Sequence, residues 1–163
     1  MTILEPLRAE HRELLPHVEH LRQTADAIGV AGAADLVDRV AADVSFLTGH
    51  LIPHARAEDA ALYPVVERLL GADGATATMS REHEEVGSLT GELSALLERL
   101  RAGEDPTAMT ADLRRVLYGL YAIVSVHFAE EEEVYLPILA KGLSAGEAEE
   151  MFAAMHRAAH TAG

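Results

Sequence analysis

The chain has 163 residues, and its 27 Asp and Glu residues outnumber its 13 Lys and Arg residues, which gives a formal net charge of −14. This charge repels nucleic acid and anionic membrane surfaces, so small molecules or metal cations are the expected partners. There is no Cys, which excludes disulfides, thiolate chemistry and sulfur-ligated zinc, and any soft-ligand metal site must use the 9 His residues.

Apolar residues recur at spacings of three and four almost throughout the chain, and alternating β-branched runs are missing. This pattern predicts an all-α fold. Glycine-rich turns, and a proline that starts one segment, divide the pattern into five helices. In chain order, we predict helices at about Leu4–Ile28, Ala33–Leu70, Thr76–Arg101, Pro106–Lys141 and Ala145–His160.

Four long helices joined by short connections are typical of an antiparallel up-and-down four-helix bundle. We expect this bundle at about residues 3–141, with a short fifth C-terminal helix at about residues 144–160, in a single domain of residues 1–163. Ser144 and Glu147 form a plausible capping box for the fifth helix. Prolines inside the predicted helices should bend them or end them locally. These prolines are Pro16, Pro53, Pro64 and Pro137.

No segment approaches the roughly 20 apolar residues of a membrane span. We therefore expect a cytoplasmic protein without a membrane partner.

The chain contains an internal repeat. Residues 54–66 (HARAEDAALYPVV) align without gaps on residues 127–139 (HFAEEEEVYLPIL). His matches His, Glu matches Glu and Pro matches Pro in this alignment. Upstream of each segment lies a second matched pair, Glu10-His11 in the first half and Glu82-His83 in the second. The chain is therefore interpreted as two copies of one helical hairpin.

The repeat predicts a metal site. A His and a Glu four residues apart lie on one helix face, about one turn apart, and can reach one ion. Each half supplies two His and one carboxylate, a set that non-haem iron commonly uses while coordination positions stay open. Paired around a pseudo-twofold axis, both sets would point inward and the two carboxylates could bridge two ions. The predicted ligands are His11, His54, Glu58, His83, His127 and Glu131.

Other interpretations of these residues are weaker. A lone His-x-x-x-Glu pair is usually a surface hydrogen bond, but two gapless copies with matched upstream histidines favour a metal site. The order of His before Glu differs from the Glu-x-x-His of ferritin-like proteins. A phosphotransfer bundle needs one solvent-facing His and does not account for a repeated, inward-facing set. Zinc suits the same ligands chemically and is the less favoured ion.

The predicted ligands resemble the motif of the hemerythrin-like family, also called the HHE cation-binding family: His, His-x-x-x-Glu, His, His-x-x-x-Glu. The resemblance covers about residues 3–141. It implies a four-helix bundle that holds two iron ions, oxo- or hydroxo-bridged when oxidised. It also implies that the centre binds oxygen or reacts with peroxide or nitric oxide.

Two positions depart from the oxygen-carrying members of that family. Those carriers have a further ligating His where this chain has Met79, whose thioether is a poor ligand for hard iron, so one iron should have a spare position. Their last carboxylate is an Asp five residues after its His, whereas Glu131 follows His127 by four. Both changes favour a more reactive or a sensing centre over reversible oxygen transport. The handling of peroxide or other reactive species is the favoured function, with catalase- or peroxidase-like turnover as one form of it.

Several points stay open at the level of sequence. An iron or oxygen sensor, or an iron-storage module without turnover, is the alternative function. The redox partner and the oligomeric state are not specified. His50 is a candidate to replace the missing ligand, and Tyr135 is a candidate to reach the centre. The acidic neighbours of Glu131 are interpreted as a solvated helix face.

Overall fold

The computed structural model describes residues 3–160, and every regular element within them is helical. The elements are α1 (Glu5–Ala27), α2 (Ala33–Phe46), η1 (Leu47–Leu51), α3 (Ile52–Ala57), η2 (Glu58–Leu62), α4 (Tyr63–Leu70), α5 (Ala77–Arg101), η3 (Pro106–Met109), α6 (Thr110–Glu130), η4 (Glu131–Tyr135), α7 (Leu136–Gly142) and α8 (Ala145–His160). The segments η1, η2 and η4 are π-helical turns, and η3 is a 3-10 turn.

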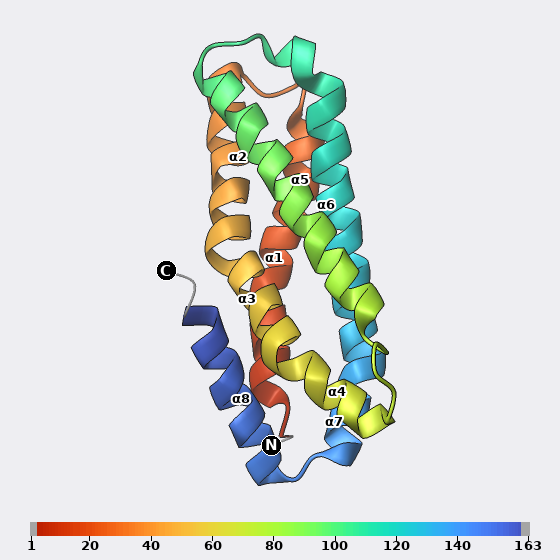
Figure 1. Ribbon diagram of the computed structural model, residues 1–163. Helices are drawn as coiled ribbons and strands as arrows, with labels where there is room; N and C mark the ends of the chain where they lie inside the picture. The colour runs from red at the N-terminus through yellow and green to blue at the C-terminus, as the bar shows by residue number, and fades with distance from the viewer. Residues whose placement is uncertain (1–2, 161–163) are drawn as a thin grey trace.

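Four long helical stretches form an antiparallel bundle (Figure 1). The first is α1, the second runs without a break from α2 to α4, the third is α5, and the fourth runs from η3 to α7. Helix α1 packs against α2 and α6, and α5 packs against the same two helices. The predicted four-helix bundle with a fifth C-terminal helix is therefore confirmed, and each long stretch ends within about one residue of its predicted bounds.

Three of the four helical prolines follow a widened turn. Pro53, Pro64 and Pro137 each lie two residues after the last residue of a π-helical turn. A proline has no backbone N–H and its ring clashes with the carbonyl four residues earlier, so the turn before it widens instead of continuing as α-helix. The expected disruptions are therefore π-helical turns inside continuous helices. Helix α1, in contrast, continues through Pro16 as regular α-helix.

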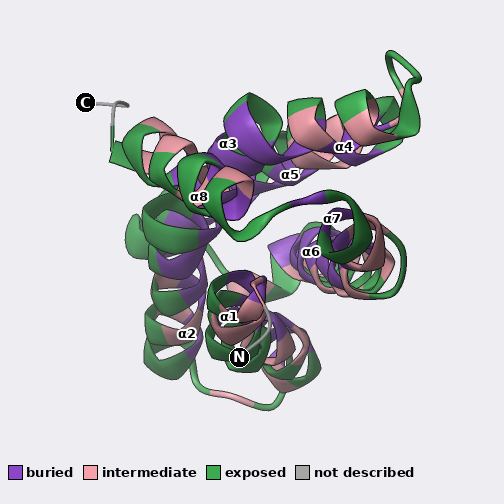
Figure 2. Ribbon diagram, turned by 90° about the horizontal axis from the view of Figure 1, so that it is seen from below, coloured by how far each residue is buried: buried purple, intermediate pink, exposed green. Residues whose placement is uncertain are grey.

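A polar layer divides the apolar core. One buried cluster includes Leu14, Leu51 and Phe128 and extends toward the end of the bundle that holds the turn between α1 and α2. A second cluster includes Leu7 and Met79 and lies near α4, α7 and α8. The His and Glu side chains between the two clusters are buried on three of the four stretches, and the His on α5 at this level is partly exposed. Figure 2 shows the buried faces of the long helices directed toward one another.

Helix α8 lies on the outside of the bundle, against α3 and η2 (Figures 1 and 2). It begins with the predicted capping box: the backbone N–H of Ser144 donates to Glu147 Oε2 at 2.9 Å, and the backbone N–H of Glu147 donates to Ser144 Oγ at 3.3 Å. Within residues 3–160, no helix combines the length and the apolar character that crossing a bilayer requires.

Candidate metal centre

All four stretches of the bundle contribute to one buried cluster. It contains His11 from α1, His54 from α3, Glu58 from η2, His83 from α5, His127 from α6 and Glu131 from η4. His83 is partly exposed and the other five side chains are buried. The structure thus brings together every predicted ligand. Their atoms form two groups that share Glu58: the first contains His11, His54, Glu58 and Glu131, and the second contains Glu58, His83 and His127.

Glu58 lies between two pairs of imidazoles and is fully buried. Its Oε1 is 2.9 Å from His54 Nε2 and 3.8 Å from His11 Nε2. Its Oε2 is 3.4 Å from His83 Nε2 and 3.9 Å from His127 Nε2. One carboxylate therefore directs one oxygen to each pair, as a carboxylate shared by two ions would.

Glu131 also faces both groups, and a tyrosine holds it. Its Oε2 is 3.3 Å from His11 Nε2, and its Oε1 is 3.6 Å from His127 Nε2. The hydroxyl of Tyr63 donates to Glu131 Oε1 at 2.9 Å. That hydroxyl is also 3.4 Å from His83 Nε2 and 3.3 Å from His127 Nε2. Tyr63 therefore belongs to the centre.

A carboxylate holds the outer nitrogen of each imidazole. The Nδ1 atoms of His11 and His83 lie 2.9 Å from Glu132 and Asp59, the residues that follow Glu131 and Glu58 in the two repeats. The Nδ1 atoms of His54 and His127 lie 3.0 Å from Glu10 and 2.8 Å from Glu82, the residues that precede the two upstream histidines. Outer carboxylates of this kind orient a ligating imidazole and raise its basicity. The four outer carboxylates therefore follow the same internal repeat as the six cluster residues.

The carboxylates and imidazoles of the cluster shift one another's pKa values. Burial by itself would raise the pKa of Glu58, but His54, His11 and His127 hold it well below its ordinary value. Burial and the charge of Glu58 raise the pKa of Glu131. Burial opposes protonation of His11, yet the nearby carboxylates of Glu131 and Glu58 raise its pKa to about 9. A cation at this position must displace a proton near neutral pH, so its affinity should rise as the pH approaches 9.

The donor atoms fit resident divalent ions. Seven buried side-chain atoms have no hydrogen-bond partner within the described part of the chain, and five of them are atoms of the two ligand groups that face other cluster residues: His11 Nε2, His54 Nε2, Glu58 Oε1, Glu58 Oε2 and Glu131 Oε2. Buried polar atoms are costly unless something satisfies them. His83 Nε2 and His127 Nε2 lie 3.0 Å apart. Two nitrogens bound at a right angle to one ion, each at about 2.1 Å, have about the same separation.

Apolar side chains cover the centre. Phe128 stacks on the ring of His11, with centroids 4.6 Å apart. A cavity of about 10 Å³ lies beside Glu58 and is also lined by Leu51, Val86 and Val124. This volume holds about one water molecule. The space beside Glu58 therefore accommodates only very small molecules.

The structure also places the other sequence candidates. His50 is exposed and belongs to neither ligand group, so it does not replace the missing ligand. Tyr135 is half-buried, with its ring 6.4 Å from that of Tyr63, and Tyr63 is the tyrosine in contact with the centre. Met79 is buried in the same apolar cluster as Tyr63. The hydroxyl of Tyr63, rather than an open space, faces the second group on that side.

The fold and the cluster together define a helical-bundle protein with a buried His and carboxylate metal site. The chain matches the Hemerythrin HHE cation binding domain over residues 2–139 and belongs to that family. Searches of curated proteins and of solved structures gave no match.

Removing one of the four outer carboxylates tests how much they contribute to metal binding. We expect Glu82→Gln to lower metal affinity by about 10- to 100-fold, because His127 loses the charge that orients its ring. Competition with a chromophoric chelator measures the affinity. Glu84→Gln on the same helix is the control, because Glu84 is exposed and pairs with Arg81. Equal affinities of the two variants would contradict the assigned role.

Proposed function

We propose that this protein holds two iron ions in the buried cluster and uses them to react with peroxide, oxygen or nitric oxide. The observation that carries the proposal is the position of Glu58, with one oxygen directed at His11 and His54 and the other at His83 and His127. A bridging carboxylate between two pairs of imidazoles suits two ions that share one site.

In this proposal, His11 and His54 bind the first iron, and His83 and His127 bind the second. Glu58 and Glu131 lie between them. Both sets contain fewer than six protein donors, so small exogenous molecules can bind as well. Bound iron supplies a Lewis acid and electrons. Zinc in the same ligands would supply only the former.

The surrounding residues have separate roles. Phe128, Leu51 and Val124 exclude bulk water and restrict the centre to small molecules. Burial and the charges of Glu58 and Glu131 raise the pKa of Tyr63 far above its ordinary value, so its hydroxyl keeps its proton and donates to Glu131 Oε1. This fixed donor adjoins the second group, where charge would develop on a bound molecule.

Reaction with peroxide is favoured over reversible oxygen transport. The ligating His of the oxygen carriers is absent at Met79, and the phenol of Tyr63 faces the second group instead. A phenol that keeps its proton is a weaker ligand than an imidazole, which leaves the second iron less saturated by protein donors.

The test is metal analysis followed by spectroscopy. Protein purified without chelator is expected to contain about two irons per chain, and its near-ultraviolet bands should change when peroxide is added. Oxygen release beyond one equivalent per centre would establish catalase-like turnover. A single spectral change without turnover would instead support the sensor or storage function. Colourless protein that contains zinc or no metal, even after anaerobic iron loading, would refute the iron proposal.

A further inference from the structure

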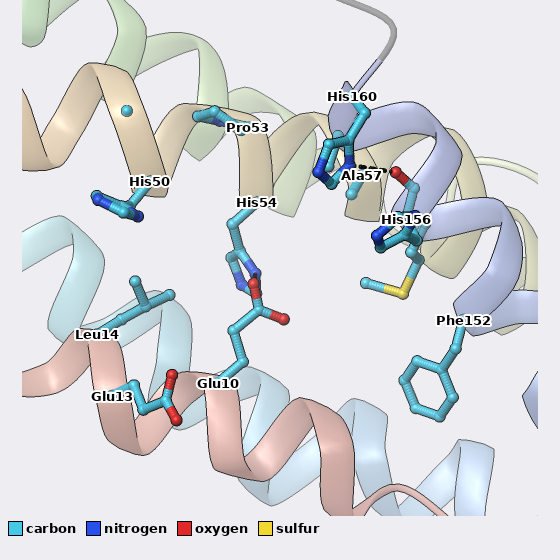
Figure 3. A pocket seen from close by; sticks show the side chains of 13 residues that line it. Glu10, Glu13, Leu14, His50, Pro53, His54, Ala57, Phe152, His156 and His160 are labelled. Carbon is cyan, nitrogen blue, oxygen red and sulfur yellow. Dashed lines mark hydrogen bonds and ion pairs between the residues drawn. The ribbon is translucent and has the colours of Figure 1, made fainter.

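A cavity of about 570 Å³ opens beside the cluster, between α1, the η1–α3 segment and α8. Figure 3 shows its labelled side chains around one space: Glu10 and Glu13 from α1, His50 from η1, and His156 and His160 from α8. This volume is within the range of ordinary ligand pockets. Its apolar floor includes Leu14, Phe152 and Met155.

The polar side chains of this pocket are of types that can bind cations. Carboxylates and imidazoles together suit divalent first-row metals. Within the described part of the chain, the side chains of Glu13 and His50 have no hydrogen bond or ion pair, so their polar side-chain atoms are free to bind. His160 Nδ1 donates to the backbone carbonyl of His156 at 2.7 Å, which leaves Nε2 of His160 free. The two rings stack with their centroids 4.3 Å apart.

His54 connects this pocket to the buried cluster. Its side chain lines the pocket and belongs to the first ligand group. Its Nδ1 is paired with Glu10, an exposed residue that also lines the pocket, and its Nε2 faces Glu58. A cation held by Glu10 therefore lies one imidazole ring away from the cluster.

The opposite approach to the first ligand group has a different charge. A cavity of about 420 Å³ beside His11 is lined by Arg8 and Arg12. Within the described residues, Arg8 pairs with Glu132, the one carboxylate that lines this cavity, and Arg12 pairs with Glu5. The lining therefore offers a cation no carboxylate without a cationic partner, whereas Glu13 in the other pocket has no such partner in residues 3–160. The acidic pocket beside His54 is the better route for a positive ion of these two.

We propose that the pocket between α1, α3 and α8 takes up divalent transition-metal cations and delivers them to the centre past Glu10 and His54. The inference rests on the proposed metal centre and adds the route by which the centre fills. His156 and His160 lie beyond residues 2–139, the part of the chain that matches the family. This uptake pocket therefore depends on the C-terminal helix of this chain.

The test follows loading of the metal-free protein with Co²⁺, which gives visible bands and resists oxidation by air. The variant combines Glu13→Gln, His156→Asn and His160→Asn, all exposed residues outside the cluster. The control combines Glu149→Gln and Glu150→Gln, exposed residues of α8 that do not line the pocket. The control removes more negative charge than the variant does, so it corrects for general attraction of cations.

We expect the variant to load about tenfold more slowly than the wild type and to reach the same final cobalt content, while the control loads at the wild-type rate. Release to excess chelator should slow by the same factor, because the route changes and the binding equilibrium does not. Unchanged rates of cobalt loading and release in the variant would overturn the uptake route and would not contradict the metal centre. Faster release would show a weakened centre and would also overturn the uptake route. A wild-type protein that binds no cobalt would instead refute the metal centre itself.

Discussion

Replacing Glu58 by Gln is expected to abolish the filling of both metal positions. Gln has nearly the same shape, but its amide cannot give one anionic oxygen to each pair of imidazoles. Loss of an outer carboxylate costs about 10- to 100-fold in metal affinity, so loss of a shared ligand should cost about 100-fold or more. Metal content after anaerobic iron loading and chelator competition measure this effect.

Two comparisons separate this effect from misfolding and from loss of charge. Far-ultraviolet circular dichroism of the metal-free variant should show the helical content of the wild type. Glu133→Gln is the control, since Glu133 is an exposed residue of η4, the segment that begins with Glu131. It should bind metal like the wild type. A Glu58→Gln protein that still fills two positions with unchanged affinity would refute the bridging role.

The six inner residues could be predicted because their signal is local. A His and a Glu four residues apart share a face of an α-helix, and the structure keeps α-helix from His54 up to Glu58 and from His127 up to Glu131. The internal repeat then predicted the contacts between the two halves of the chain, because two equivalent hairpins bring equivalent helix faces together. Helix bounds followed from residues such as Gly71, which has a φ of 63° at the end of α4.

Tyr63 could not be found by the same rule. In an α-helix, a residue five positions after Glu58 is rotated by about 140° away from it. The π-helical turn Glu58–Leu62 is bonded from each residue to the fifth along, which brings Tyr63 back over Glu58. Tyr135, four residues after Glu131 at the end of the equivalent turn Glu131–Tyr135, is half-buried, with its ring 6.4 Å from that of Tyr63. Proline two residues after each turn was the available signal for this change of register.

The outer carboxylates were missed for a different reason. Asp59 and Glu132 are partly exposed at their side chains, and the acidic run after His127 has the composition of a solvated face. Their roles depend on partners from the other half of the chain, since Asp59 pairs with His83 and Glu132 pairs with His11. Spacing within one helix contains no information on such contacts. The matched positions of these carboxylates in the repeat were the only local signal.

Replacing Tyr63 by Phe is expected to slow the reaction with peroxide by about 100-fold and to leave metal content unchanged. The substitution removes the hydroxyl that donates to Glu131 Oε1 and keeps the ring that stacks on His83. Removing one preorganised donor from a buried site typically costs about 100-fold or more in rate. The effect should appear in kcat and not in KM, because the hydroxyl lies at the cluster and not along a route of access.

Tyr135→Phe is the matched control, because that tyrosine is half-buried and, within the described residues, has no hydrogen bond to the six cluster residues. It should react at the wild-type rate. A purely structural role of Tyr63 makes a different prediction. Loss of a buried hydrogen bond to a charged group would lower the free energy of unfolding by about 1.5–3 kcal/mol and leave kcat intact. Urea unfolding and stopped-flow kinetics on the same iron-loaded variant distinguish the two, and a stability loss with an unchanged kcat would refute a role of this hydroxyl in the reaction.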